Sequence, residues 1–300
     1  MQTLILVIII AAIVIMIINI RMYYLYIRNS KDVLSSGKLS DKIWKTAGFH
    51  LLLFFLAGYI AIAIFGKADI LTAFILFGGS LFVSIMINLL FRLVNTVKER
   101  SIDVAEVLVE VIEARDPNLN GHSRYVQNLT MLFIKYIPAE MKKGISEVSL
   151  EYAALLHDVG KLGVPESVLN KTEKLNDNDW ELIRHHPQKG VEILRPLKSF
   201  EHILPWIEYH HERIDGKGYY GLSGEEIPFA ARIIAVCDTY SAITMRRAYK
   251  PAKTHEDAIR IMKEVAGTQL DAELVKIFCT IPKEELEKCI PEYVEVDVKT

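Results

Sequence analysis

The chain has 300 residues, of which 51% are hydrophobic, and a formal net charge of −2. That charge excludes the basic footprint of a protein that binds long nucleic acid. The mean hydropathy of +0.22 is high for a soluble enzyme, so we expect part of the chain to lie in lipid. No CxxC pair occurs among the three cysteines, which argues against a disulfide framework or a thiolate zinc site and favours a reducing compartment.

Three apolar runs without Asp, Glu, Lys or Arg occupy the N-terminal part, at residues 3–20, 47–66 and 70–91. Each is about long enough to cross a hydrocarbon core of ~30 Å as a helix that satisfies its own backbone. A cleaved signal peptide is an alternative for the first run, but no basic region precedes it. Buried soluble helices are the alternative for all three. We expect residues 1–91 to form a membrane domain with three transmembrane helices in the lipid bilayer.

The basic residues of the loops predict the orientation of this domain. Six lie between the first two runs, Lys67 alone lies between the second and third, and three follow the third at Arg92, Lys98 and Arg100. Basic residues stay in the cytoplasm. We therefore expect a multi-pass protein of the cell (inner/plasma) membrane, with its N-terminus outside and everything after Phe91 in the cytoplasm.

Residues 92–115 are predicted to form a connecting helix that ends before Pro117. Apolar or small residues recur along it at spacings of three and four, namely Val94, Val97, Ser101, Val104, Leu108 and Val111. This face has two interpretations that the sequence leaves open. The helix packs on its own domain, or it forms the seam of a homodimer through the membrane helices and residues 92–115, although fewer than four heptads are present.

Residues 116–300 are predicted to form an all-helical cytoplasmic domain. Helical spacing appears in SLEYAALLHDV, DNDWELIRHH, PFAARIIAVCDTYSAIT and HEDAIRIMKEVA, and no long β-alternation occurs. The third of these begins at Pro228, which suits a first helical turn. The predicted fold class is therefore all-α, with three N-terminal transmembrane helices followed by a helical domain.

Histidines and carboxylates within this domain suggest a metal site. His157 and Asp158 end an apolar helix, and Asp238 follows four apolar residues, where an unpaired carboxylate is costly. The alternatives are a backbone-bonded helix end for the pair and a buried ion pair with an arginine for Asp238. His210-His211 and His186 also have ordinary interpretations as surface residues. Adjacent side chains on a helix diverge by about 100°, so His210 and His211 would share a site only if it lies between them or spans two metals.

The order of His122, His157-Asp158 and Asp238 resembles the HD phosphohydrolase superfamily. The segments HDVGKLGVP, HP, HHERIDGKGY and GTQLD resemble its HD-GYP subgroup, which degrades cyclic di-GMP, over residues 92 to 280. The resemblance implies two divalent metal ions, iron or manganese, and a bridging hydroxide that cleaves a cyclic dinucleotide. It implies metal ligands at His122, His157, Asp158, His186, His210, His211 and Asp238. It assigns catalytic roles to Asp158, Lys161 and Asp238, and substrate contacts to Lys161, Tyr219, Arg247 and Lys250.

Four departures from the subgroup's pattern matter. Its GYP reads Gly218-Tyr219-Tyr220, its DRPYR reads Arg246 to Lys250, a usual second Asp is Ser241, and a Glu that binds a third metal is Asn118. Two metals are therefore expected rather than three. The altered substrate loops leave two alternatives open, which are hydrolysis of another nucleotide phosphoester and a catalytically silent receptor for a dinucleotide.

Overall fold

The computed structural model describes residues 1–29, 39–66, 68–115, 121–171, 173–245 and 251–291. The chain divides into two compact units, Met1–Ser101 and Ile102–Thr300. Within the described ranges every regular element is helical, apart from one isolated bridge between Ala266 and Leu270. The predicted all-α class is confirmed.

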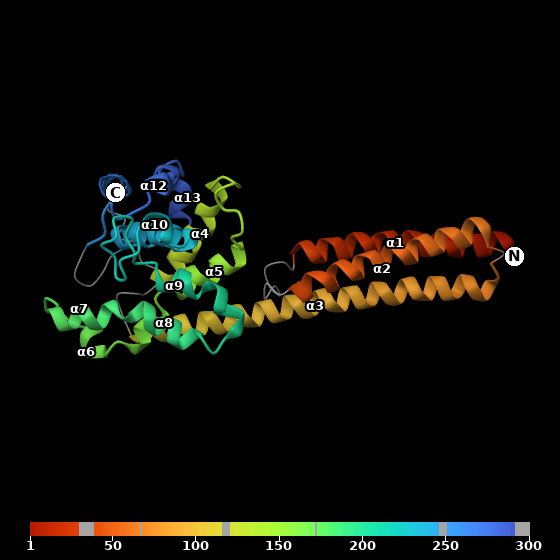
Figure 1. The fold of residues 1–300 in the computed structure, drawn as a ribbon, viewed down its shortest axis with the longest axis horizontal. Helices are drawn as coiled ribbons and strands as arrows, with labels where there is room; N and C mark the ends of the chain where they lie inside the picture. Colours follow the sequence, from red (N-terminus) through yellow and green to blue (C-terminus); the bar gives the residue numbers. More distant parts are fainter. Residues whose placement is uncertain (30–38, 67, 116–120, 172, 246–250, 292–300) are drawn as a thin grey trace. The chain divides into compact units, whose positions relative to one another are not determined.

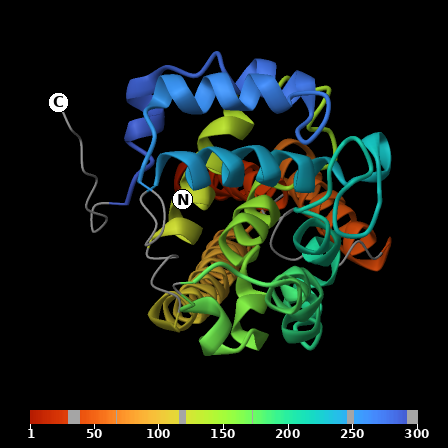
Figure 2. The ribbon, with the colours of Figure 1, turned by 90° about the vertical axis from the view of Figure 1, so that its left-hand side faces the viewer.

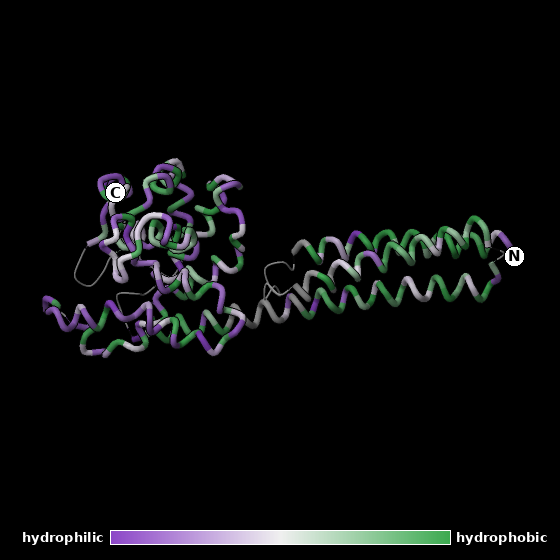
Figure 3. Tube along the Cα trace, in the orientation of Figure 1, coloured by the Kyte–Doolittle hydropathy of each residue, from purple (hydrophilic) through white to green (hydrophobic). Residues whose placement is uncertain are grey.

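Three long helices run through the first unit: α1 (Gln2–Asn29), α2 (Leu39–Phe65) and the N-terminal part of α3 (Ile70–Arg115) (Figure 1). They contain three segments that are long and apolar enough to cross a membrane, Gln2–Ile27, Thr46–Phe65 and Ile70–Leu93 (Figure 3). A buried polar contact joins two of them, because Asn19 donates to the Ser80 carbonyl oxygen at 2.9 Å and accepts from the Ser84 hydroxyl at 2.6 Å. Such contacts satisfy polar groups that lipid cannot satisfy.

The second unit begins with the end of α3 and continues through short helices. In chain order they are α4 (His122–Tyr136), α5 (Glu147–Leu156), η2 (Val159–Gly163), α6 (Glu166–Leu169), α7 (Asp177–Arg184), α8 (His186–Leu194), η3 (Lys198–Ile203), α9 (Leu204–Glu208), η4 (Gly224–Glu226), α10 (Phe229–Thr244), α11 (His255–Val265), α12 (Ala272–Phe278) and α13 (Lys283–Glu287). The middle layer is α10, which packs on α4 and on α11 and α12 (Figure 2). The helix α10 begins at Phe229, one residue later than predicted, and Pro228 is its N-cap.

One apolar core holds this unit together, and it includes Tyr125, Phe133, Leu155, Ile234 and Phe278. Burying each such side chain contributes roughly 1.5–3 kcal/mol. Since α4, α5 and α10 all pack into it, their ends are held in fixed positions. His122 begins α4, His157 and Asp158 directly follow α5, and Asp238 lies within α10.

The end of α3 also packs into this core, but through a face that the spacing did not predict. Val104 and Val111 are 56% and 47% exposed, whereas Ala105, Val109 and Ile112 are buried. The buried stripe is offset by one residue, which on a helix is a rotation of about 100°. Within residues 104–115 the helix therefore packs on its own domain and leaves part of the predicted face open.

Candidate metal centre

Three buried histidines lie just beyond the ends of helices, where backbone carbonyl groups lack helical partners. The ring nitrogen Nδ1 of His157 lies 2.8 Å from the Ala154 oxygen, that of His186 lies 2.8 Å from the Ile183 oxygen, and that of His210 lies 2.6 Å from the Ile207 oxygen. A carbonyl oxygen only accepts, so Nδ1 must carry the proton in each ring. The Nε2 lone pair of each is left for a metal ion.

His122 is held by a different device, at the start of α4. Its Nδ1 lies 2.9 Å from the Ser241 hydroxyl oxygen, and the Ser241 hydroxyl donates to the Met245 sulfur at 3.3 Å. The hydroxyl oxygen therefore accepts from Nδ1, so that Nε2 is the nitrogen that faces the carboxylates of Asp158 and Asp238. Ser241, a departure from the expected aspartate, orients this predicted ligand.

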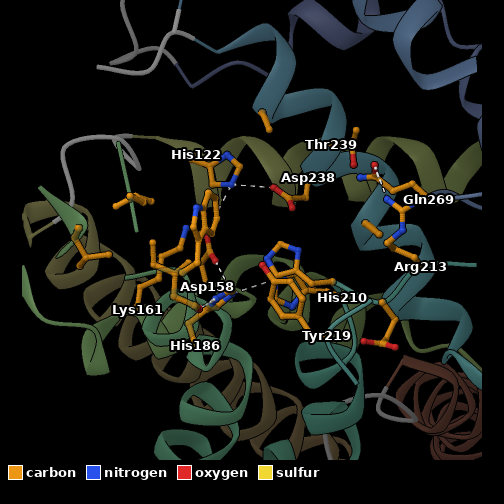
Figure 4. A pocket seen from close by; sticks show the side chains of 18 of the residues that line it. His122, Asp158, Lys161, His186, His210, Arg213, Tyr219, Asp238, Thr239 and Gln269 are labelled. Atoms are coloured by element: carbon orange, nitrogen blue, oxygen red, sulfur yellow. Dashed lines mark hydrogen bonds and ion pairs between the residues drawn. The ribbon is translucent and has the colours of Figure 1, made fainter. Parts of the chain in front are cut away.

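Asp158 lies at the centre of the cluster, between α5 and η2 (Figure 4). Its Oδ1 is 3.2 Å from His186 Nε2, while its Oδ2 is 3.4 Å from His157 Nε2 and 3.8 Å from His122 Nε2. Two groups of ligand atoms, each within 4.8 Å, share this carboxylate. They are Asp158 with His186, His210 and His211, and Asp158 with His122 and His157. The geometry suits one carboxylate that bridges two cations.

Asp238 extends the second group from α10. Its Oδ1 lies 3.1 Å from His122 Nε2, and its side chain is 15% exposed. Among the described residues, the structure therefore pairs Asp238 with His122 rather than with an arginine. Figure 4 shows His122, Asp158 and Asp238 pointing toward one another.

His210 and His211 follow α9 in a turn, so the divergence expected on a helix does not apply to them. Their ring centroids are 4.0 Å apart, and the His211 ring lies 5.0 Å from that of His186. On its other side the His211 ring lies 4.9 Å from the ring of Tyr219. Both histidines therefore face the same site.

Burial and neighbouring charges give His210, His211, Asp158 and Asp238 the protonation states of metal ligands, whereas they shift the pKa of His157 in the opposite direction. Burial and the adjacent imidazoles hold the pKa of His210 well below its usual range and lower that of His211 to about 3. Burial alone would raise the pKa of Asp158, but Lys161 and His157 hold it well below its usual range. Burial would likewise raise the pKa of Asp238, but His122 holds it well below its usual range. Burial disfavours a charged His157, but Asp158 raises its pKa above the ordinary value.

Two buried polar atoms of the cluster fit metal ligands. Among the described residues, His157 Nε2 and Asp158 Oδ1 have no hydrogen-bond partner. Leaving buried polar atoms unsatisfied costs about 1–3 kcal/mol each. Neutral imidazoles and ionised carboxylates are ligands of first-row divalent metals, so the residues present fit two such ions.

A cavity of about 630 Å³ opens over the cluster. Its lining includes the predicted substrate residues Lys161 and Tyr219, and Lys161 Nζ lies 2.7 Å from Asp158 Oδ2. His157 is fully buried beneath the lining. Arg247 and Lys250 lie outside the described residues.

The structure adds residues that the sequence did not single out. Glu212 accepts from the backbone N–H groups of Tyr220 and Leu222 at 2.7 Å each, and so holds the loop that carries Tyr219. Trp180, 45% exposed, lines the cavity beside Ile183. The only sequence signals were a glutamate beside the histidine pair and a tryptophan on a polar helix.

Known proteins resemble this part of the chain. A family model described as HD domain matches residues 106–274. The chain belongs to the HD domain family. The chain is 34% identical over 165 residues to 3'3'-cGAMP-specific phosphodiesterase 3 of Vibrio cholerae, covering 55% of this chain and 35% of that protein. It is 44% identical over 128 residues to cyclic di-GMP phosphodiesterase PA4108 of Pseudomonas aeruginosa, covering 42% and 31%. The matches thus span about a third of the length of these curated relatives.

Among solved structures, the crystal structure of the cyclic GMP-AMP specific phosphodiesterase V-cGAP3 of V. cholerae aligns with a TM-score of 0.46 and 20% identity. The alignment covers 63% of this chain and 51% of that one. This likeness is distant, and the contacts described above stand without it.

Proposed function

We propose that this chain is a metal-dependent phosphodiesterase that hydrolyses a cyclic dinucleotide, most directly cyclic di-GMP, to a linear dinucleotide or GMP. The observation that carries the proposal is Asp158, whose two oxygens face two separate sets of imidazole nitrogens. Relatives named as phosphodiesterases of cyclic di-GMP and of cGAMP support it.

Residues of the HD domain would hold the metal ions and accept the proton of the attacking water. His122, His157 and Asp238 would hold one divalent ion, His186, His210 and His211 the other, and Asp158 both. Two such ions, iron or manganese, would supply an activated water and offset charge on the phosphate. Asp158 and Asp238, ionised at neutral pH because of their lowered pKa values, would accept the water's proton.

The cavity would bind and orient the dinucleotide. Lys161 lies beside Asp158 with 15% of its side chain exposed, so its ammonium group would meet a ring phosphate. Tyr219 would contact the dinucleotide, and burial raises the pKa of its hydroxyl to about 12, so it remains a hydrogen-bond donor. We further propose that Arg247 and Lys250 contact the substrate.

We also propose that residues 1–91 anchor the HD domain to the cell membrane, with the N-terminus outside and the domain in the cytoplasm. The three apolar segments support the anchoring, and the basic loops support the orientation. A homodimer through the membrane helices and residues 92–115 is a further part of this proposal. The exposed side chains of Val104, Val107 and Val111 are consistent with it.

A substrate panel tests the proposal. The full chain in detergent, loaded with Mn²⁺ or Fe²⁺, is assayed with cyclic di-GMP, cGAMP and cyclic di-AMP. We expect turnover of cyclic di-GMP above the other two. Hydrolysis of a different phosphoester alone would refute the substrate assignment. Tight binding without hydrolysis under either metal would identify a receptor and refute the enzymatic proposal.

A further inference from the structure

The helix that begins with His122 has a glycine as its N-cap. Gly121, with φ 73°, has no side chain that could cap the first turn of α4. The first N–H groups of a helix need acceptors from elsewhere. Glu113, at the end of α3, supplies one, because its Oε2 accepts from the Gly121 N–H at 3.0 Å.

The surroundings of Glu113 match this role. Burial raises its pKa, while the N–H groups of Gly121 and Ser123 and the charge of Arg124 stabilise the ionised form. A carboxylate at the start of a helix also interacts favourably with the helix dipole. The carboxylate thus holds the backbone directly before His122.

A second contact from α3 reaches the other part of the cluster. Arg115 Nη1 donates to the Leu162 carbonyl oxygen at 2.8 Å. Leu162 belongs to η2, which begins directly after Asp158 and contains Lys161. The two contacts lie two residues apart on α3, yet they hold the two backbone segments that present His122 and Asp158.

The end of α3 is itself held firmly. Ala105, Val109 and Ile112 are buried in the domain core. About two turns before Glu113, Glu106 forms an ion pair with Arg124 of α4 at 2.8 Å. A displacement of this part of α3 would therefore be passed to α4 and η2.

We propose that Glu113 and Arg115 are positioning residues of the metal centre, Glu113 acting on His122 and Arg115 on the turn that carries Asp158 and Lys161. The inference rests on the proposed function only in that the histidine and aspartate cluster binds metal. Both residues belong to the connecting helix predicted at residues 92–115. Movement of that helix would then change the metal geometry, and with it the activity of the site.

The experiment compares metal binding by variants of the full chain in detergent. Glu113→Ala and Arg115→Ala remove the contacts, whereas Glu113→Gln and Arg115→Lys keep an acceptor and a donor. Glu110→Gln, at an exposed position on the same helix, is the matched control. Mn²⁺ affinity is measured by competition with a chelator, the absorption spectrum of bound Co²⁺ reports ligand geometry, and thermal unfolding without metal reports stability.

We expect each alanine variant to bind Mn²⁺ about 10- to 100-fold more weakly, as is typical when a residue that orients a ligand is lost. Its Co²⁺ spectrum should change as well. The conservative variants should retain most of the affinity, and Glu110→Gln should match the unaltered chain. Alanine variants with unchanged affinity and spectrum, or with lowered stability alone, would overturn the inference. Absence of phosphodiesterase activity in the unaltered chain would refute the proposed function and leave this result intact.

Discussion

Gly160 allows the backbones of η2 and α8 to touch, and this contact sets the distance between two predicted ligands. A Cβ at this position would lie 1.7 Å from the His186 carbonyl oxygen and 2.4 Å from the Gly190 nitrogen. These backbone atoms cannot rotate away as a side chain can. Ordinary contact begins at 3.4 Å, so Gly160→Ala must separate the two segments by about 1.7 Å.

This separation would change the distance between Asp158 and His186 in the metal cluster. η2 follows Asp158 and α8 begins at His186, whose Nε2 lies 3.2 Å from Asp158 Oδ1. We expect Gly160→Ala to cost about 1–3 kcal/mol of stability, as overpacking does, and to lower turnover about 100-fold. Gly163→Ala is the control, because the three atoms nearest to its Cβ all belong to the flexible Lys189 side chain, the first at 3.2 Å.

The assay combines a metal titration, turnover of cyclic di-GMP and thermal unfolding, each on both variants. Activity is measured well below the unfolding temperature so that the fraction folded does not matter. Gly163→Ala should resemble the unaltered chain in all three measurements. Metal affinity and turnover of Gly160→Ala equal to those of Gly163→Ala would refute the reasoning.

Three further predictions concern the cavity and its protonation. Trp180→Ala should raise KM for cyclic di-GMP about 5- to 150-fold with little change in kcat, because an aromatic face stacks a base with about 1–3 kcal/mol; an equal fall in kcat instead would contradict this role. Glu212→Gln should weaken the 212–222 loop by about 1.5–3 kcal/mol, since one of its two N–H groups then faces an amide NH₂; limited proteolysis should cut this loop faster, and an unchanged rate would count against it. The metal-free chain should lose stability as pH falls from 7 to 5. The pKa values of His210 and His211 are lowered by folding, so over this range the unfolded chain binds protons at these residues that the folded chain does not. The raised pKa of His157 has the opposite effect on stability, but it is one histidine against two. Urea unfolding measures this, and greater stability at pH 5 would reverse the sign.

The all-helical class and the apolar segments could be predicted from the sequence because both depend on local patterns. Helical spacing and turn residues are visible within about fifteen residues, and a run without charge is visible directly. The predicted cluster also came together, since its histidines and Asp158 lie at or near helix ends, and Asp238 within α10, and one core holds these helices in place. The buried face of α3 was wrongly placed because apolar spacing there allows two stripes one residue apart, and only the tertiary packing chooses Ala105 over Val104.

The orientation of the ligands could not be predicted in the same way. Whether His157 presents Nε2 depends on a carbonyl group left free where α5 ends, which is a property of the backbone rather than of a motif. The loop that carries Tyr219 is held by hydrogen bonds to Glu212. The His122 ring is oriented by a hydrogen bond to Ser241, 119 residues further along the chain. Contacts at such a separation follow from the fold and leave no local pattern.

The account depends most on Asp158 as a carboxylate shared by two cations. The most direct test is to measure metal ions bound per chain, together with turnover of cyclic di-GMP, in the unaltered protein and in Asp158→Ala. We predict two divalent ions and turnover for the unaltered chain, and loss of metal and activity in Asp158→Ala with helical content retained by circular dichroism. Asp158→Ala protein that binds two ions and keeps full turnover would contradict the account.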